Sequence, residues 1–110
     1  MALFDEIFNE IKTKVIGLAT DEVKVYKDKA VKDTNEYLQT SKEKLKKWTL
    51  LLVDKKIDGE EFEYLVNSQL GLGEMKVLTN VGIAQIKAEK FKNDVINLVV
   101  NTVLTRVLKV

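Results

Sequence analysis

Apolar side chains recur every eleven residues along the first half of the chain. The first members of this repeat are Phe4, Val15, Tyr26, Tyr37 and Trp48. Each is followed four residues later by a second, mostly smaller member, and these are Phe8, Ala19, Ala30, Ser41 and Leu52. Three turns in eleven residues correspond to about 3.67 residues per turn, which is close to the period of an unstrained helix. The pattern therefore predicts one long α-helix over residues 2–53.

The second half of the chain repeats this pattern after a charged, turn-prone run at residues 54–58. Its members eleven residues apart are Phe62, Gly73, Ala84 and Val95. Asp58 and Glu61 have the spacing of a capping box, in which each side chain accepts a hydrogen bond from the backbone N–H of the other residue. We expect a turn at 54–58 and a second helix over residues 59–109, both within a single helical domain of residues 1–110.

The two helices match each other if they fold back antiparallel about this turn. Facing residues then have numbers that sum to about 114, and large side chains tend to meet small ones, as close packing requires. The facing pairs include Leu52 with Phe62, Trp48 with Val66, Ala19 with Val95, Val15 with Val99 and Ile11 with Val103. The sequence therefore predicts a long antiparallel helical hairpin of coiled-coil type.

Such a hairpin would be about 75 Å long and would have no third layer to cover its remaining apolar side chains. Those side chains are concentrated at the open end, near the two chain termini. The simplest cover is a second copy, because soluble oligomers are most often symmetric homodimers. We expect a homodimeric four-helix bundle that self-associates through Leu3, Phe4, Ile7, Phe8, Val100, Leu104, Val107 and Leu108.

An alternative fold follows if glycines interrupt the helices. Gly17, followed by Thr20 and Asp21, could end the first helix, and Gly71 with Gly73 could end the second. Glycine costs about 1 kcal/mol inside a helix and commonly marks its C-terminal end. The chain would then fold as a compact bundle of four or five helices.

Composition narrows the classes of function. The 110 residues are 45% hydrophobic and 32% charged, and the net charge of +1 offers no general attraction for nucleic acid. Acidic residues among the first apolar positions do not fit a signal peptide, so we expect a cytoplasmic protein or, as the alternative, one on the inner membrane surface. An adaptor role implies a protein partner, whose identity the sequence does not show.

Catalytic, metal and cofactor sites lack their usual residues. The chain has no histidine and no cysteine, so we expect no enzyme activity, metal site or cofactor. Asp58 and Glu61 are similar to the end of a calcium-binding EF-hand loop, but Leu50 and Leu52 occupy the earlier ligand positions. The segment from Leu45 to Leu65 also resembles the short C-terminal helical hairpins of some bacterial proteins, which implies a turn and a capped helix but no activity.

Lysines around Trp48 allow two interpretations. Lys42, Lys44, Lys46 and Lys47 next to an aromatic residue could bind an anionic partner or lipid headgroups. They could equally form a solvated face beside a tryptophan in the core, and we favour this interpretation because Trp48 lies on the predicted seam.

A lipid surface is the main alternative partner. Eleven-residue amphipathic repeats flanked by lysines resemble those of apolipoproteins and other lipid-surface helices. The apolar run at 95–110 is too short to span a bilayer, and Asn97, Asn101, Arg106 and Lys109 interrupt it. We therefore expect a non-enzymatic structural or adaptor module that acts by helix packing and self-association, with a peripheral lipid-binding protein as the alternative.

Overall fold

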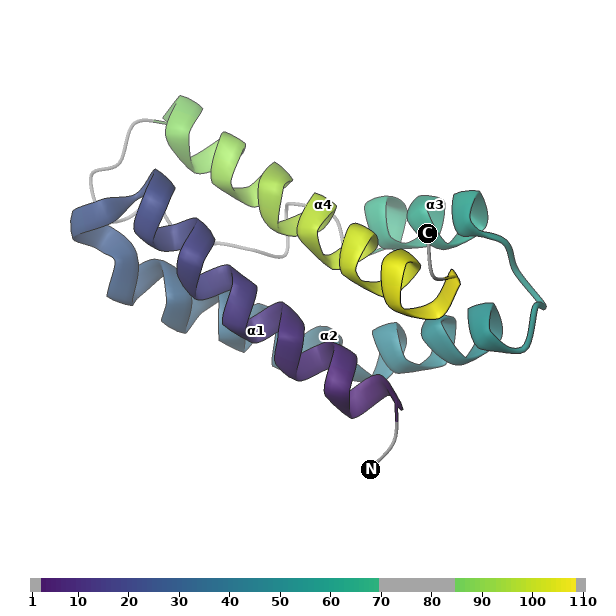
Figure 1. Ribbon diagram of the computed structural model, residues 1–110. Helices are drawn as coiled ribbons and strands as arrows, with labels where there is room; N and C mark the ends of the chain where they lie inside the picture. Colours follow the sequence, from purple (N-terminus) through teal and green to yellow (C-terminus); the bar gives the residue numbers. More distant parts are fainter. Residues whose placement is uncertain (1–2, 70–84, 109–110) are drawn as a thin grey trace.

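The computed structural model describes residues 3–69 and 85–108. Within these ranges the chain forms α1 (Leu3–Glu22), a short 3-10 helix η1 (Lys24–Tyr26), α2 (Lys27–Val53), α3 (Gly59–Gln69) and α4 (Gln85–Leu108), as Figure 1 shows. The described residues contain no strand, so the predicted all-α class is confirmed.

The prediction of a continuous helix over residues 2–53 is wrong, because the chain reverses at η1. Lys24 has a φ of 35°, and the Tyr26 N–H donates to the Val23 carbonyl at 2.8 Å. After this turn α2 runs back along α1, so that Lys42 Nζ lies 5.2 Å from the centre of the Phe8 ring. Valine and tyrosine have only modest helix propensity, and the reversal gives α1 a neighbour to pack against. Gly17, one of the expected break points, lies inside α1.

The prediction of a single helix over residues 59–109 is also wrong. A Cβ placed on Gly59 would lie 3.5 Å from Leu104 Cδ2, whereas a continuous helix would separate these residues by about 65–70 Å. The start of α3 therefore lies beside the end of α4. The expected break at Gly71 and Gly73, and every facing pair that involves residues 70–84, lie outside the described residues.

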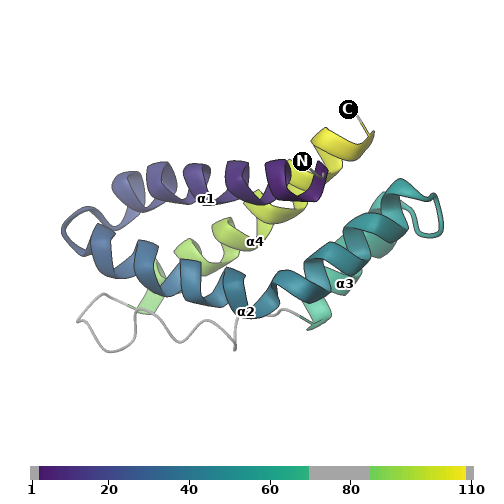
Figure 2. The same cartoon turned by 90° about the horizontal axis from the view of Figure 1, so that it is seen from below.

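The helices form a bundle rather than an extended hairpin. α1 packs against α2 and α4, and α3 packs against α2 and α4, as the views in Figures 1 and 2 show. The principal extents are 43 × 26 × 24 Å, much shorter than the roughly 75 Å of a two-helix hairpin. The compact bundle that the sequence offered as its alternative fold is the one observed.

The predicted antiparallel register nevertheless holds between α1 and α4. Arg106 pairs with Glu10, and Lys90 Nζ lies 3.4 Å from Glu22 Oε1. In both pairs the residue numbers sum to within two of 114. The apolar residues between these two ion pairs are almost completely buried, and they include Ile11, Val15, Ala19, Val95, Val99 and Val103. The seam was therefore predicted correctly in its register, although it joins two separate helices of the bundle.

The turn between α2 and α3 forms where the sequence predicts it. Lys55, with a φ of 61°, ends α2, and the Lys56 N–H donates to the Leu51 carbonyl at 2.9 Å. This backbone pattern is a Schellman motif, in which one left-handed residue lets the last helical carbonyls find donors. The Glu61 N–H then donates to Asp58 Oδ1 at 2.8 Å, and the Asp58 N–H donates to Glu61 Oε1 at 3.2 Å. The predicted capping box is confirmed.

We predict that Lys55→Gly raises the free energy of unfolding by about 1 kcal/mol, because glycine adopts the left-handed conformation without Cβ strain. Lys56→Gly is the matched control, since Lys56 has no positive φ and gains nothing from the loss of its side chain. Urea denaturation followed by circular dichroism measures both variants. Equal effects of the two substitutions would contradict the left-handed end of α2.

Gly17→Ala tests whether α1 runs through residue 17. No heavy atom lies within 4 Å of a Cβ added there, and the backbone is helical, so alanine should add about 0.5–1 kcal/mol to the free energy of unfolding. If a helix instead ended at Gly17 in a left-handed conformation, alanine would lower that free energy. The same denaturation measurement decides between the two results.

Candidate interaction surface

The residues predicted to mediate self-association divide into three groups by exposure. Four are buried within the chain and belong to its core, namely Phe4, Ile7, Phe8 and Val100. Leu104 and Val107 are half-buried and pack against that core. Leu3 and Leu108 remain 40% and 45% exposed. The monomer thus already uses half of the predicted set.

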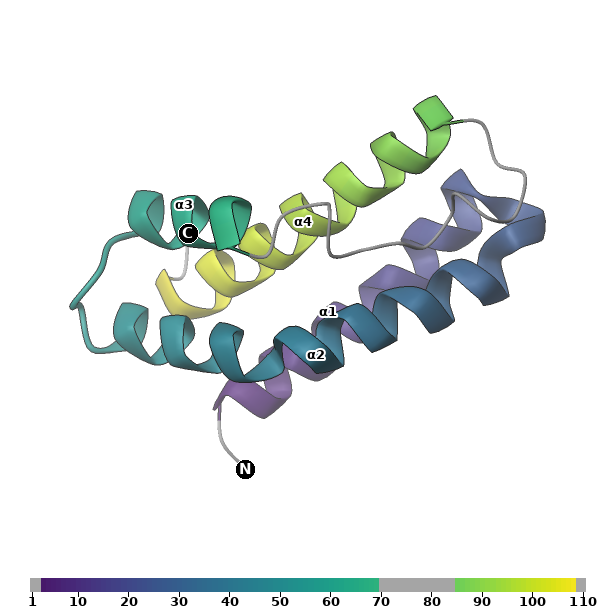
Figure 3. The ribbon, with the colours of Figure 1, turned by 180° about the vertical axis from the view of Figure 1, so that it is seen from behind.

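The chain itself supplies much of the cover that the sequence analysis assigned to a second copy. Because α1 is antiparallel to both α2 and α4, the start of α1 lies beside the ends of the other two helices (Figure 3). The start of α3 closes on the same region, with Gly59 against Leu104 and Leu108. The four helices therefore bury Phe4, Ile7 and Phe8 inside one molecule.

Several apolar side chains stay exposed at this end of the bundle. Leu3 begins α1 and Leu108 ends α4, and Leu50 and Val53 belong to the last turn of α2. Leu50 and Val53 are 47% and 41% exposed. We call Leu3, Leu50, Val53 and Leu108 the apolar end. Single exposed leucines are ordinary on protein surfaces, whereas exposed apolar side chains on several helix ends at one end of a bundle are candidates for an interaction site.

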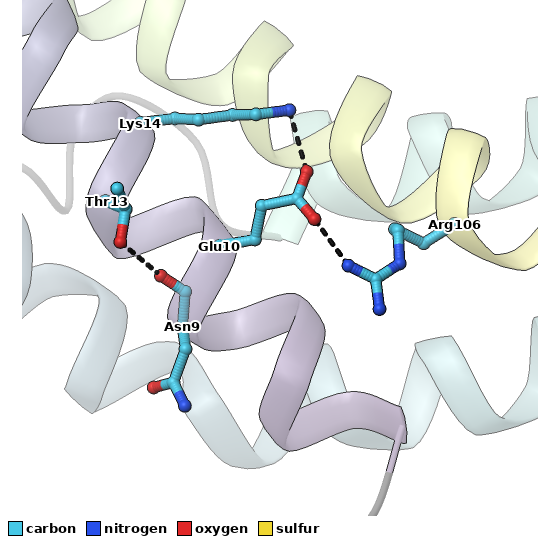
Figure 4. A network of polar contacts seen from close by, with 5 residues as sticks. All are labelled: Asn9, Glu10, Thr13, Lys14 and Arg106. Atoms are coloured by element: carbon cyan, nitrogen blue, oxygen red, sulfur yellow. Dashed lines mark hydrogen bonds and ion pairs between the residues drawn. The ribbon is translucent and has the colours of Figure 1, made fainter.

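An ion-pair network ties α1 to α4 near the apolar end (Figure 4). The Glu10 carboxylate accepts from the Arg106 guanidinium and lies 2.8 Å from Lys14 Nζ. Hydrogen bonds from Lys14 and Arg106 lower the pKa of Glu10. Thr13 Oγ1 donates to the Asn9 carbonyl at 3.1 Å on the same helix. These contacts hold the ends of the two helices in register.

A second polar cluster joins the other end of α1 to α4. Lys90 Nζ lies 2.8 Å from Asp94 Oδ2 and 3.4 Å from Glu22 Oε1. Burial and a hydrogen bond with Asp94 raise the pKa of Glu22, and these effects outweigh the nearby Lys90. The same hydrogen bond from Glu22, together with that from Lys90, lowers the pKa of Asp94. Glu22 is therefore the carboxyl group of this cluster that takes up a proton first as the pH falls.

Lys42, the first lysine of the cluster around Trp48, packs against the core of its own chain. Lys42 and Lys12 place their ammonium groups 5.2 and 5.6 Å from the centre of the Phe8 ring, within the range of cation–π attraction. Trp48 is buried, as the second interpretation of the sequence predicts, so it is no surface anchor. Lys44, Lys46 and Lys47 remain exposed on α2.

The clusters of charged side chains found in the described part of the chain are ion pairs and a helix cap. No group of three or more carboxylates that could hold a metal ion occurs in the described part of the chain. Asp58 and Glu61, which are similar to EF-hand ligands in sequence, are occupied by the capping box. The Glu10 and Glu22 clusters were not predicted, although the 114 register places both glutamates on the seam beside charges of α4.

Comparison of the chain with protein-family models, curated proteins and solved structures gives no match. Among the described helices, none has the length and apolar character needed to cross a membrane. The function is therefore inferred from burial, charge and contacts within this chain.

Replacing Glu22 with glutamine should make the bundle more stable at about pH 7 but not at about pH 4. Because folding raises the pKa of Glu22, the ionised group costs stability at neutral pH, and this cost disappears as pH falls below the ordinary value of 4.5. Asp94 has the opposite effect on stability. Because folding lowers its pKa, its ionised form stabilises the bundle, and this stability is lost as the pH falls below the ordinary pKa of 3.8. Thermal melts at several pH values measure the difference.

Glu36→Gln is the control for this experiment, since Glu36 is exposed on α2 and its side chain forms no salt bridge with a described residue. A gain that is the same for both variants, or that grows as pH falls, would contradict the raised pKa of Glu22 in the half-buried carboxyl pair.

Proposed function

We propose that this chain is a non-enzymatic structural or adaptor module that self-associates as a homodimer through the apolar end. The observation that carries the proposal is that Leu3 and Leu108 stay exposed, and Leu104 and Val107 only half-buried, after the core has formed. Adding Leu50 and Val53 gives apolar side chains on three helix ends at the same end of the bundle. In a symmetric dimer the same surface of each copy forms the interface, so one set of residues covers the apolar end of both chains.

The burial of the eleven-residue apolar repeat inside the bundle favours a protein partner over a lipid surface. Phe4, Phe8, Val15 and Ala19, which a lipid-binding helix would insert into a membrane, are buried between helices. Lipid insertion of these residues would require the bundle to open. The lipid alternative retains support from the exposed lysines near Leu50 and Val53, which suit an anionic inner membrane surface.

A non-enzymatic role is supported by the chemistry of the chain. Without histidine or cysteine, general base and nucleophile roles would fall to carboxylates, lysines or hydroxyl groups. The described carboxylates with shifted pKa values, Glu10, Glu22 and Asp94, are all engaged in contacts along the α1–α4 seam. We propose a cytoplasmic location for the module.

Leu108→Glu should convert the dimer to a monomer of about 12.5 kDa, because a charged side chain at the centre of an apolar contact loses its hydration on association. Leu3→Glu should act in the same way from α1. Sedimentation equilibrium measures the mass of each variant, and circular dichroism checks that the helices remain.

Ile16→Glu is the matched control, since Ile16 is 46% exposed on α1 but lies away from its ends. It should keep the dimer mass. A monomeric wild-type protein, or dimers that survive glutamate at both Leu3 and Leu108, would overturn the proposal. Binding of the monomer to anionic vesicles would then favour the lipid alternative.

A further inference from the structure

The turn between α1 and α2 is held by few local interactions. It contains neither glycine nor proline, and Lys24 has a φ of 35°, in the left-handed region that a residue with a Cβ disfavours. Neither Val23 nor Tyr26 caps the helix that follows it with a side-chain hydrogen bond. Val25 is 88% exposed, so it adds almost no apolar burial. The reversal at η1 therefore depends on the packing of α1 against the rest of the bundle.

The eleven-residue repeat continues through this turn. Val15 and Tyr37 lie eleven residues before and after Tyr26, and Ala19 and Ala30 are also eleven residues apart. Val15, Ala19, Ala30 and Tyr37, which flank the turn, are almost fully buried. A helix that continued through η1 would therefore bury one face along its whole length, from α1 into α2.

The antiparallel packing of α1 on α2 has its midpoint in η1. Lys42 Nζ lies 5.2 Å from the centre of the Phe8 ring, so residues whose numbers sum to about 50 lie beside each other. The midpoint of this register is Val25, in the middle of η1. Two continuous helices that lie antiparallel and cross at residue 25 would thus make the α1–α2 contacts twice, each time between different copies.

We propose that two copies of this chain exchange α1, with η1 of each copy opening into one helix that joins α1 to α2. Each half of this dimer consists of α2, α3 and α4 of one copy and α1 of the other. A twofold axis at residue 25, perpendicular to the plane of the two long helices, relates the copies. This axis requires both parts of each long helix to bury the same face, and the continuous repeat meets that requirement.

The occupant is a second copy because it supplies the contacts that already stabilise one copy. Glu10 pairs with the partner's Arg106, and Glu22 with the partner's Lys90, in place of the same pairs within one chain. Exchange also releases the positive φ of Lys24, and short strained turns between packed elements favour such exchange. High protein concentration favours the exchanged dimer by mass action.

The exchange goes beyond the association proposed above and is independent of it. It needs neither Leu3 nor Leu108, because each half of the exchanged dimer keeps its own apolar end. Chains that fold at low concentration keep the closed form described above, since α1 then meets its own α4 before that of another copy.

A single spin label at exposed Asp21 tests the exchange. The Asp21→Cys chain is refolded from urea at high and at low concentration, and its dimers are isolated by size exclusion and measured by electron resonance. Exchange places the two labels about 15–20 Å apart, because each lies four residues from the axis on neighbouring antiparallel helices. Only the sample refolded at high concentration should show this distance.

A dimer of closed chains gives a different distance. η1 lies at the opposite end of the bundle from the start of α1 and the end of α4 (Figure 2). Asp21 lies about 27 Å from Leu3 along α1, so joining two apolar ends separates the labels by more than about 50 Å. If every dimer shows this long distance, the exchange is wrong and the apolar-end dimer stands.

Lys24→Gly tests η1 as the hinge. Glycine adopts the left-handed turn freely and weakens a continuous helix, so the proportion of exchanged dimer should fall at least about tenfold. Lys55→Gly is the matched control, because Lys55 also has a positive φ but lies in a turn that both forms share. It should leave the proportion unchanged, and circular dichroism checks that both variants are helical. Equal effects of the two glycines, or no effect of either, would contradict the hinge.

Leu108→Glu in the Asp21→Cys chain separates the two modes of association. The variant should lose the dimer of closed chains and keep the dimer with the short distance. Loss of the short distance in this variant, while its monomer stays helical, would show that the exchanged dimer does not form independently of the apolar end.

Discussion

The antiparallel packing of α1 on α4 determines where the remaining helices can lie. Its apolar residues are deeply buried, and Ile7, Ile11 and Val15 have no exposed surface, as is also true of Leu38 on α2 and Phe62 on α3. Ion pairs from Glu10 and Glu22 close the two ends of this seam. Close-packed pairs of helices still expose an apolar side, which needs a third layer. The reversal at η1 brings α2 onto this pair, and α3 then packs against both α2 and α4.

This arrangement explains where the chain accepts backbone strain. Lys24 and Lys55 both have positive φ values, which lysine disfavours, and they occur at the two turns that flank α2. The strain costs about 1–2 kcal/mol at each position, and the burial of side chains such as Leu45, Leu52 and Phe62 offsets it. The remaining exposed apolar residues lie mostly at helix ends, where the chain has no further element among the described residues to cover them.

Local signals allowed part of this fold to be predicted from the sequence. The turn at 54–58, the capping box of Asp58 and Glu61 and the register of α1 against α4 follow from short-range spacing and from matched periods. The break at Val23–Tyr26 could not be predicted, because neither glycine nor proline marks it. The free energy that favours this reversal comes from tertiary packing of α2 against α1. For the same reason Phe4, Phe8 and Val100 were assigned to contacts between copies. A sequence shows that a side chain must be covered, but not whether its own chain or another provides the cover.

The most direct test of this account is a distance between α1 and α2. The chain has no cysteine, so cysteines at exposed Asn9 and Glu43 can be spin-labelled specifically and measured by pulsed electron resonance after dilution with unlabelled protein. The bundle predicts a short distance, because neighbouring helix axes lie about 10 Å apart. A distance of about 50 Å, expected for one continuous helix across η1, would contradict it.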